Sequence, residues 1–292
     1  MIEKAIEKAE VLLEAFPYIQ QFSKKIIVIK YGGSTIEENE IDGSILRDIA
    51  FMSTIGIYPV LVHGGGKHIS NALKNAGIES AFVQGLRVTD EASIKIVEDV
   101  LVNKVNAAIV AKLKEFGCEA VQLSGKMNSM IKVEKMLKKD ETGNIVDWGF
   151  VGRIKRICPR HIFDAILNGK VPVIAPIGVD KFGQIYNINA DTVAAEIAIA
   201  ISAEKLVYLT DVPGIMRDQK NIDTLISTIK ECEVQQLIDD GIIKGGMLPK
   251  VEACVKALRN NVSKTHIISG DIKHSLLLEI FTNLGIGTEF VM

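Results

Sequence analysis

The chain is poor in aromatic residues and carries almost no net charge. Aromatic side chains make up 5% of its 292 residues, and 34 basic side chains against 36 acidic ones give a formal charge of −2. Acidic and basic residues are interspersed, so we expect no basic surface that would bind nucleic acid or an anionic membrane. No apolar run is long enough to span a bilayer. The sequence therefore predicts neither a nucleic-acid-binding protein nor a membrane protein.

Cysteine is also scarce. The four cysteines lie far apart and form no C-x-x-C or Cys/His cluster, which argues against a zinc site and against a disulfide framework. Charged side chains interrupt the apolar positions of the first ten residues, so no secretion signal is expected there. Reduced thiols and a cytoplasmic location are the resulting expectation. The cysteines are Cys118, Cys158, Cys232 and Cys254.

Three common nucleotide-binding patterns are missing as well. The chain has no G-x-x-x-x-G-K-[ST] phosphate loop and no G-x-G-x-x-G dinucleotide fingerprint. It also lacks the H-R-D and D-F-G motifs of protein kinases. If this chain binds a nucleotide, it must therefore do so with a different arrangement of residues.

The apolar content is rich in Ile, Val, Ala and Leu, and strand-like runs alternate with helix-like ones. This alternation predicts a mainly parallel central sheet with helices on both faces, a three-layer αβα sandwich. Alternating residues on both sides of the turn Glu141–Asn144 predict a hairpin between residues 130 and 156. Strands are predicted at 26–29, 60–62, 120–123, 171–175, 205–209 and 265–268, and helices at 41–55, 89–116 (capped by Thr89), 190–202, 231–240, 247–260 and 274–282.

The first residues predict a helix with one apolar stripe. Its apolar positions are spaced by four and three residues, and Pro17 is predicted to end it. The helix precedes the first core strand, so it is interpreted either as an ordinary covering helix or as an arm that joins subunits. The stripe consists of Ile2, Ile6, Ala9, Leu13 and Phe16.

Two of the predicted strands end in glycine-rich turns. The first ends in Lys30-Tyr31-Gly32-Gly33, and the second ends in His63-Gly64-Gly65-Gly66 just before an amphipathic stretch. Glycine lets the backbone approach a ligand closely, and the start of a helix offers free N–H groups to an anion. Two such turns, one of them with a lysine, indicate an enzyme that handles phosphoryl groups. His63 is interpreted as a structural residue that ends a buried strand, and it is assigned no chemistry.

These turns belong to a longer series of motifs that resembles the amino acid kinase family. The resemblance covers the chain from about residue 10 to the end, in the family's order and spacing. It implies an N-terminal arm over residues 1–23, a substrate lobe over 24–180 and an ATP lobe over 181–292. The other motifs are Gly85-Leu86-Arg87-Val88-Thr89, Asn187-Ile188-Asn189-Ala190-Asp191, Leu209-Thr210-Asp211-Val212-Pro213-Gly214 and Gly245-Gly246-Met247-Leu248-Pro249-Lys250.

The motifs are most similar to those of family members that phosphorylate the γ-carboxylate of N-acetyl-L-glutamate in arginine biosynthesis. The resemblance implies ATP as phosphoryl donor, with Mg²⁺ bound to its phosphates and water rather than in a cage of protein carboxylates. A carboxylate is already ionised at neutral pH, since its reference pKa is about 4.3, and so it needs no general base. The reaction needs instead cations and N–H donors that bring two anions together and stabilise the transferred phosphoryl group.

The resemblance also implies roles for individual residues. Lys30 and Lys250 would flank the transferred phosphoryl group, and Asp191 would hold both ammonium groups in place. Arg87 would bind the α-carboxylate of the substrate in a fork, with Asn187 on the same side. Gly65 and Gly66 would complete the substrate site, and the phosphate and nucleotide site would comprise Gly32, Gly33, Thr210, Asp211, Gly214 and Gly246.

Each of these roles has a structural alternative. A lysine that ends a strand is usually solvated, which applies to Lys30. Asp191 is also a natural cap for a helix that begins near Thr192. Arg87 could be an ordinary surface residue. Asn187 is only slightly favoured over Asn189 as the substrate-binding residue.

Both ends of the chain resemble family members that L-arginine inhibits. Those members have an N-terminal helix that interlaces dimers into a homohexamer, a trimer of dimers, and a C-terminal segment like 274–289. The resemblance therefore implies L-arginine as an effector, with Glu279 available to pair with its guanidinium group. The implied arginine site comprises Tyr18, Glu279, Gly285 and Gly287, with a basic residue near Arg217.

Two alternatives remain open. The chain could be a related kinase that acts on an N-modified aminoadipate, aspartate, glutamate or UMP, although the motif 85–89 and the two ends favour N-acetyl-L-glutamate. It could also be a ligand-sensing ring without catalytic activity. The presence of Lys30, Asp191 and Lys250 disfavours that second alternative.

Overall fold

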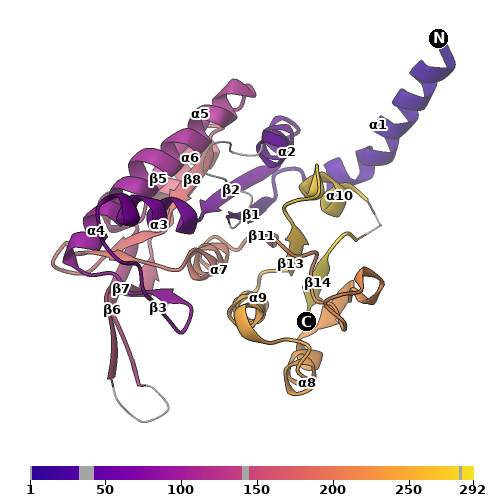
Figure 1. Cartoon of the computed structure of the whole chain (residues 1–292). Coiled ribbons are helices and arrows are strands. Elements are labelled where there is room, and N and C mark those ends of the chain that lie inside the picture. Colours follow the sequence, from indigo (N-terminus) through magenta and orange to yellow (C-terminus); the bar gives the residue numbers. More distant parts are fainter. Residues whose placement is uncertain (1, 33–42, 140–144, 283–284) are drawn as a thin grey trace.

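The centre of the molecule is an eight-stranded sheet in the order β12-β14-β13-β11-β1-β2-β8-β5. Figure 1 shows the protein as a computed structural model, which describes residues 2–32, 43–139, 145–282 and 285–292. Neighbouring strands are parallel except for the pair β13–β14. The strands are β1 (Ile26–Tyr31), β2 (Tyr58–His63), β5 (Ala120–Ser124), β8 (Val171–Ala175), β11 (Lys205–Thr210), β12 (Thr228–Lys230), β13 (Lys264–Ser269) and β14 (Thr288–Val291).

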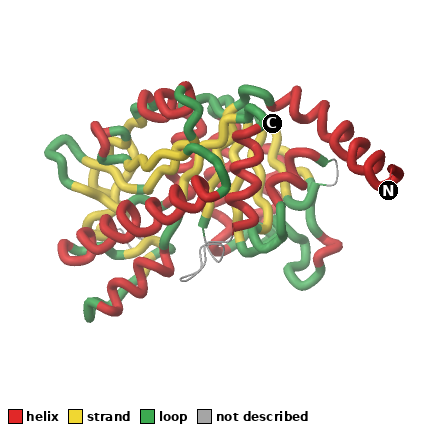
Figure 2. Tube along the Cα trace, turned by 90° about the horizontal axis from the view of Figure 1, so that it is seen from above, coloured by secondary structure: helices red, strands yellow, loops and turns green. Residues whose placement is uncertain are grey.

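Helices cover both faces of this sheet, as the view from above shows (Figure 2). Successive side chains of a strand point to opposite faces, so Ile27 and Ile29 of β1 join one apolar core and Val28 joins the other. The predicted three-layer αβα sandwich is therefore confirmed. The first core is covered by α2 (Gly43–Thr54), α3 (Gly66–Asn75), α4 (Glu91–Glu98), a π-helical segment (Asp99–Asn106), α5 (Ala107–Glu115) and α10 (Ser275–Phe281), and the second by α6 (Arg160–Leu167), α7 (Ala190–Ala200), α8 (Val234–Asp239) and α9 (Leu248–Arg259).

A second group of strands stands beside the main sheet. β6 (Ile131–Lys139) and β7 (Ile145–Ile157) form the predicted hairpin, whose predicted turn at Glu141–Asn144 lies outside the described residues. With two short strands they close a small barrel in the order β10-β7-β6-β9. The short strands β9 (Ile177–Val179) and β10 (Ile185–Asn187) were not predicted, nor were β12, β14 and the paired strands β3 (Phe82–Val83) and β4 (Leu86–Arg87).

The start of α4 corrects one prediction. Asp90, rather than Thr89, caps the helix, because its carboxylate accepts a hydrogen bond of 2.7 Å from the N–H of Ser93. Thr89 is fully buried and forms a β-bridge with Gly149 of β7. The backbone of Thr89 is thus committed to the hairpin, which leaves the capping position to the next residue.

The N-terminal helix α1 (Ile2–Phe22) continues through Pro17, so the predicted helix end at that residue is wrong. A proline removes one N–H bond, and here the loss falls on a part of the helix whose side chains are exposed. The final turn is held by packing, since Phe22 is buried and Tyr18 lies edge-on to Phe281 of α10, with ring centroids 6.4 Å apart. The first turns of α1 project away from the body (Figure 1). Within the described ranges, neither α1 nor any other helix is long and apolar enough to cross a membrane.

Phe290 tests whether β14, which the sequence did not reveal, belongs to the core. Its side chain is fully buried. Phe290→Ala would leave a cavity and is expected to lower the free energy of unfolding by about 3–5 kcal/mol. Met292, which is 71% exposed, provides the control, and Met292→Ala is expected to change the free energy by less than about 0.5 kcal/mol. Urea denaturation measures both, and equal small effects would contradict the placement of β14.

Candidate active site

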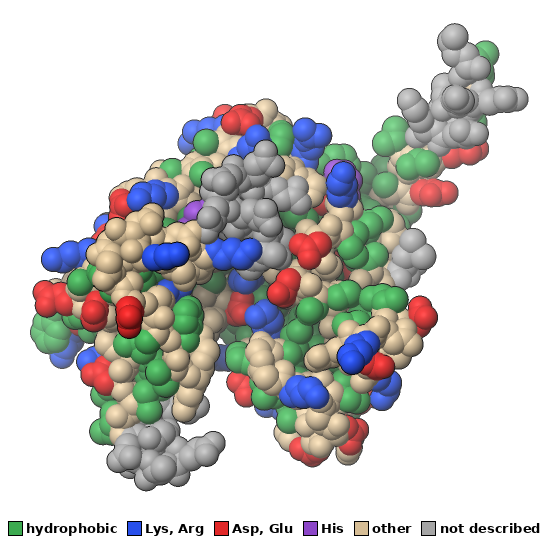
Figure 3. Space-filling view, in the orientation of Figure 1, with side chains coloured by type: hydrophobic (Ala, Val, Ile, Leu, Met, Phe, Trp, Pro, Cys, Tyr) green, Lys and Arg blue, Asp and Glu red, His purple; other side chains and the backbone are tan. Residues whose placement is uncertain are grey.

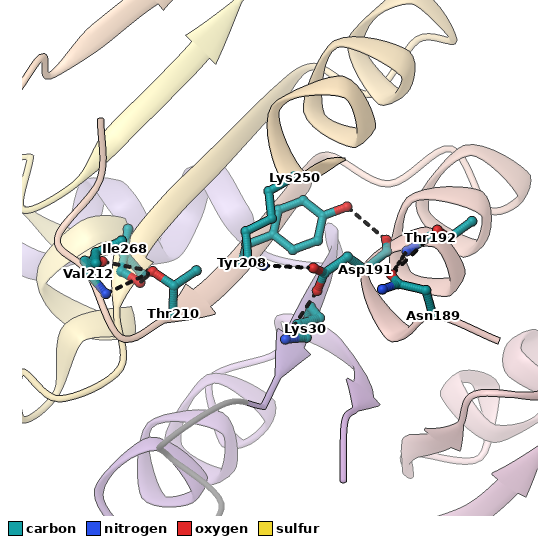
Figure 4. A network of polar contacts seen from close by, with 9 residues as sticks. All are labelled: Lys30, Asn189, Asp191, Thr192, Tyr208, Thr210, Val212, Lys250 and Ile268. Atoms are coloured by element: carbon teal, nitrogen blue, oxygen red, sulfur yellow. Dashed lines mark hydrogen bonds and ion pairs between the residues drawn. The ribbon is translucent and has the colours of Figure 1, made fainter. Parts of the chain in front are cut away.

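Three charged side chains meet where β1, α7 and α9 converge (Figure 4). Lys30 lies near the end of β1, Asp191 in the first turn of α7, and Lys250 in the first turn of α9. Each oxygen of the Asp191 carboxylate pairs with one ammonium group, at 3.1 Å from Nζ of Lys30 and 3.0 Å from Nζ of Lys250. The fold therefore brings together the three residues that the sequence analysis assigned to catalysis.

The start of α7 explains why Asp191 is available for this contact. Asn189 caps the helix, and its side chain accepts a hydrogen bond of 3.0 Å from the N–H of Thr192. The alternative in which Asp191 caps the helix is therefore wrong. In addition, the hydroxyl of Tyr208 in β11 donates a hydrogen bond of 2.9 Å to the backbone carbonyl of Asp191, which fixes the first turn of α7 to β11.

The charge cluster is shielded from water. The side chains of Lys30 and Asp191 are each 10% exposed, and that of Lys250 is 24% exposed. Burial by itself would raise the pKa of Asp191, but the charges of Lys30 and Lys250 and their hydrogen bonds outweigh it, so the pKa lies below its ordinary value. Two cations share one anion, which leaves a net positive charge that an anionic ligand can neutralise.

A cavity of about 180 Å³ lies next to this cluster. Its wall includes Ala190, the neighbour of Asp191 in the chain, and Gly64, which approaches Gly32 beside the ammonium group of Lys30. The surface is also notched between the part that carries the β6–β7 hairpin and the part that carries α8 and α9 (Figure 3). All four residues predicted to bind the substrate line the cavity, namely Gly65, Gly66, Arg87 and Asn187, together with Asn189.

Arg87 is the buried cation of this cavity. Its residue is 6% exposed, so the alternative of an ordinary surface residue is wrong. The guanidinium group donates hydrogen bonds to the carbonyl of Gly66 (2.9 Å), the hydroxyl of Ser70 (2.8 Å) and the hydroxyl of Ser80. It also lies over the ring of Phe82, 4.5 Å from the ring centroid. Burial lowers the pKa of the guanidinium group.

The partners of Arg87 are all neutral. Over the part of the chain that the structure describes, no carboxylate lies within ion-pairing distance of it. A buried cation without a counter-ion is costly, and a ligand carboxylate would relieve that cost through a two-pronged hydrogen bond. The cavity wall at Arg87 is therefore suited to an anion.

Trp148 joins the β6–β7 hairpin to the segment that carries Arg87. Its ring is 1% exposed, and its Nε1–H donates a hydrogen bond of 2.9 Å to the carbonyl of Val83 in β3. Two backbone hydrogen bonds also join Thr89 to the hairpin. The N–H of Thr89 donates to the carbonyl of Trp148 (2.9 Å), and the N–H of Phe150 donates to the carbonyl of Thr89 (2.6 Å). These contacts fix the position of β3 and β4 against the hairpin.

The residues predicted to contact phosphate and nucleotide are more dispersed. Thr210 is buried, and its hydroxyl donates a hydrogen bond of 2.7 Å to the carbonyl of Val212, which shapes the loop after β11. Gly214 is close-packed, since a Cβ there would lie 2.5 Å from the hydroxyl of Thr288. Both residues thus have a structural part in this loop. Gly32 lies beside Lys30. Asp211 and Gly246 are exposed, and Gly33 lies outside the described residues.

The predicted arginine-site residues come together in part. Glu279 of α10 has a buried carboxylate whose oxygens lie 2.7 Å from Nδ1 of His266 and 3.1 Å from the N–H of Ile286. It already has two partners, which the sequence did not indicate. Tyr18 contacts the same helix through Phe281, Gly285 has a φ of 52°, Gly287 lies against the carbonyl of Ile267, and Arg217 is exposed in the loop before β12.

Sequence reasoning missed several residues that shape the cavity. Ser70 and Ser80 hold Arg87, and Asn106 contacts His63 at the end of β2. Serine and asparagine are common on helices and in loops, so their spacing carried no signal. Only the fold identifies them.

Comparison with known proteins agrees over the length of the chain. Residues 25–269 match the model of the amino acid kinase family. The chain is 50% identical over 289 residues to a protein named acetylglutamate kinase from Heliobacterium modesticaldum, which covers 98% of each chain. It is 49% identical over 296 residues to a protein of the same name from Syntrophus aciditrophicus, covering 100% of this chain and 99% of that one.

A solved structure is similar as well. It is N-acetylglutamate synthase from Neisseria gonorrhoeae, complexed with coenzyme A and N-acetyl-glutamate, with a TM-score of 0.83 and 27% sequence identity. The match covers 97% of this chain, which spans 63% of the length of that one. With its family motif, its full-length relatives and its three-layer fold, the chain belongs to the amino acid kinase family.

Proposed function

We propose that this chain transfers the γ-phosphoryl group of ATP to the γ-carboxylate of N-acetyl-L-glutamate, a step of arginine biosynthesis. The products are N-acetyl-L-glutamyl 5-phosphate and ADP. One observation carries the proposal: the cluster of Lys30, Asp191 and Lys250 borders a cavity in which Arg87 has no carboxylate partner among the described residues. The full-length relatives named acetylglutamate kinase support the choice of substrate.

Arg87 and Asn187 are the proposed substrate-binding pair. Arg87 binds the α-carboxylate, because a guanidinium group presents two parallel donors in the geometry of a carboxylate. Asn187 lines the cavity, and its amide nitrogen lies 3.5 Å from the hydroxyl of the buried Thr89. This amide group offers a further hydrogen-bond donor to the substrate. The γ-carboxylate then extends toward the charge cluster, already ionised and ready to attack.

Lys30 and Lys250 supply the positive charge for the phosphoryl transfer. The phosphoryl group in flight carries charge on its equatorial oxygens, and fixed cations stabilise that charge without reorganising at the moment of reaction. Asp191 holds the two ammonium groups at a set distance, because each of its carboxylate oxygens pairs with one of them. Mg²⁺ would come with the ATP and would offset part of the charge of its phosphates. Asp191 is not proposed as a metal ligand, since both of its oxygens are already paired with lysines.

Each of the two proposed lobes then contributes most of one binding site. The acetylglutamate site draws mainly on residues from 24–180, with Asn187 added from the other lobe. The nucleotide site draws mainly on residues from 181–292, with Thr210, Asp211, Gly214 and Gly246 as proposed contacts and with Gly32 and Gly33 added from the first lobe. The reaction takes place where the two lobes meet, because Lys30 comes from one and Lys250 from the other.

ATP turnover with trapping of the acyl phosphate by hydroxylamine tests the function directly. Hydroxamate that forms with N-acetyl-L-glutamate, but not with glutamate or N-acetylaminoadipate, is the expected result. Product with one of the other acceptors would favour a related kinase. No product with any acceptor would favour a ligand-sensing ring without catalysis.

Lys30→Ala is expected to lower kcat by about 10²–10³-fold, the usual effect of removing one donor to a transition-state charge. Lys25 provides the control at the other end of β1, since its side chain is 51% exposed and pairs with Glu204 at the surface. Lys25→Ala is expected to leave turnover unchanged. Steady-state rates of hydroxamate formation measure both variants, and a Lys30→Ala enzyme with full activity would contradict the assigned role.

Arg87→Lys keeps the charge but loses the two-pronged donor. The KM for N-acetyl-L-glutamate is expected to rise about 10–100-fold, which corresponds to roughly 1.4–2.8 kcal/mol, while the KM for ATP stays the same. Arg160→Lys is the matched control, because the side chain of Arg160 is 88% exposed. An equal rise of both KM values would point to a general loss of structure instead of a substrate contact.

We further propose that the protein is a homohexamer inhibited by L-arginine, with α1 as the arm that joins dimers. Support comes from the apolar residues of α1, several of which have no cover in a single chain. Those more than half exposed are Ile2, Ile6, Val11, Leu12, Leu13 and Phe16. Tyr18, near the end of α1, contacts Phe281 of α10, so the proposed subunit contacts and the proposed arginine site with Glu279 adjoin each other.

The double variant Leu13→Ser/Phe16→Ser is expected to reduce the assembly from hexamer to dimer and to weaken inhibition by arginine, with turnover retained. Light scattering during size exclusion gives the mass, and hydroxamate formation with added L-arginine gives the inhibition. Ile222→Ser, at a residue 55% exposed far along the chain, is the control and should remain hexameric. An unchanged mass in the double variant would rule out α1 as the arm.

A further inference from the structure

His63 ends β2 directly before the glycine turn, yet the proposed mechanism gives it no part. Its residue is completely buried. The ring has two polar neighbours: Nδ1 lies 2.7 Å from the carbonyl oxygen of Gly64, and Nε2 lies 3.1 Å from the amide nitrogen of Asn106. A carbonyl can only accept a hydrogen bond and an amide nitrogen can only donate one. The partners therefore select the neutral tautomer with the proton on Nδ1.

The ring stays in this neutral form near physiological pH. Burial, more than any other cause, lowers the pKa of His63 to about 4. A ring with so low a pKa is a weak base, and the carboxylate acceptor needs no base, so the proposed mechanism assigns His63 no proton transfer. Its effect has to come through geometry.

The geometry in question is that of the peptide between Gly64 and Gly65. A trans peptide is planar, and its C=O and N–H groups point in opposite directions. By binding the carbonyl of Gly64, His63 turns the N–H of Gly65 away from the ring. Gly65 lines the substrate cavity, and within the described ranges its N–H has no hydrogen-bond acceptor.

The neighbouring donor of the turn, the N–H of Gly64, is already paired. The N–H of Gly64 is committed to the carbonyl of Tyr31, at 2.7 Å. A Cβ at Gly65 would lie 2.8 Å from Cδ2 of Leu101, so a side chain there would require Leu101 to move. The turn thus offers the Gly65 N–H as an unpaired donor at a fixed place on the cavity wall.

Asn106 fixes the ring from behind. The residue is 1% exposed and ends the π-helical segment, a helix form that is frequent at functional sites. Its amide nitrogen lies within hydrogen-bond distance of Nε2 of His63 (3.1 Å) and of the carbonyls of Val173 (2.9 Å) and Leu123 (3.3 Å). Asn106 therefore ties the ring to the middle of β8, at Val173, and to the end of β5, at Leu123.

We propose that His63 and Asn106 are positioning residues for the phosphoryl transfer. The Nδ1–H of His63 aims the Gly65 N–H at an anionic oxygen of the reacting groups, and Asn106 sets the rotation and tautomer of the ring. This inference rests on the proposed function, because the reaction defines which oxygen is bound. It gives the histidine of the His-Gly-Gly-Gly sequence a role that needs no proton transfer.

Two substitutions separate the two ring nitrogens. The amide nitrogen of asparagine can occupy the place of Nδ1, whereas that of glutamine reaches the place of Nε2. His63→Asn keeps a donor to Gly64, so we expect its kcat to stay within about threefold of the natural enzyme. His63→Gln loses that donor and is expected to lower kcat about 10–100-fold, the range for residues that orient a reacting group from behind. KM for ATP should be unaffected in both variants.

Both variants remove the same buried ring, so thermal unfolding provides the control for structure. The proposal is overturned if His63→Asn and His63→Gln lose activity equally, in step with their Tm values. Asn106→Leu is a further variant of similar size without a donor, and a fall in its kcat at unchanged KM for ATP is expected. Full activity of Asn106→Leu would remove Asn106 from the proposal.

A measurement without turnover distinguishes this inference from the proposed function. Long-range ¹H–¹⁵N NMR spectra of the natural protein are expected to show His63 protonated on Nδ1 and unchanged between pH 6 and 8. A proton on Nε2 would overturn the inference even in an active enzyme. The absence of hydroxamate from the natural protein would refute the proposed function, whatever the spectra show.

Discussion

The site depends on one carboxylate that stands between two ammonium groups. Removing a charged group from water costs several kcal/mol, and two like charges at close range repel each other as well. Asp191 offsets both costs, because each of its oxygens faces one lysine. Lys30 and Lys250 come from distant parts of the chain, so this ion pair network is also the point that fixes β1, α7 and α9 against one another. The remaining net positive charge is what makes the place suitable for phosphate.

The parallel sheet explains why so many functional groups reach the same edge. β1 and β2 are neighbours, and their carboxyl ends deliver Lys30 and the glycine turn side by side. The alternation of side chains along β1 then turns Lys30 toward the face on which α7 packs, the face of Val28. None of these features alone would locate the site. The strand order, the alternation along β1 and the start of α7 together place Lys30 beside Asp191.

Much of this was predictable from the sequence, and the failures have physical causes. Strands that end in glycine turns stand out and indicated phosphate chemistry, while the resemblance to the family's motifs anticipated the cluster around Asp191. The capping residues could not, because Thr89 and Asp90 are both good caps and only the contact with Gly149 decides between them. The same holds for Asn189 and Asp191 at the start of α7. Pro17 was misjudged because packing beyond it outweighs one lost hydrogen bond.

The chain contains a single tryptophan, and the fold puts it at an informative place. Trp148 belongs to β7 and is buried against β3, where its indole N–H donates a hydrogen bond to the carbonyl of Val83. β3 pairs with β4, the strand that carries Arg87. The tryptophan fluorescence of the chain therefore has one origin and is expected to report on the proposed substrate lobe without a chemical label. Residues 181–292, the proposed ATP lobe, contain no tryptophan, so a change in this fluorescence would mark a rearrangement around the hairpin and β3 in the unmodified protein.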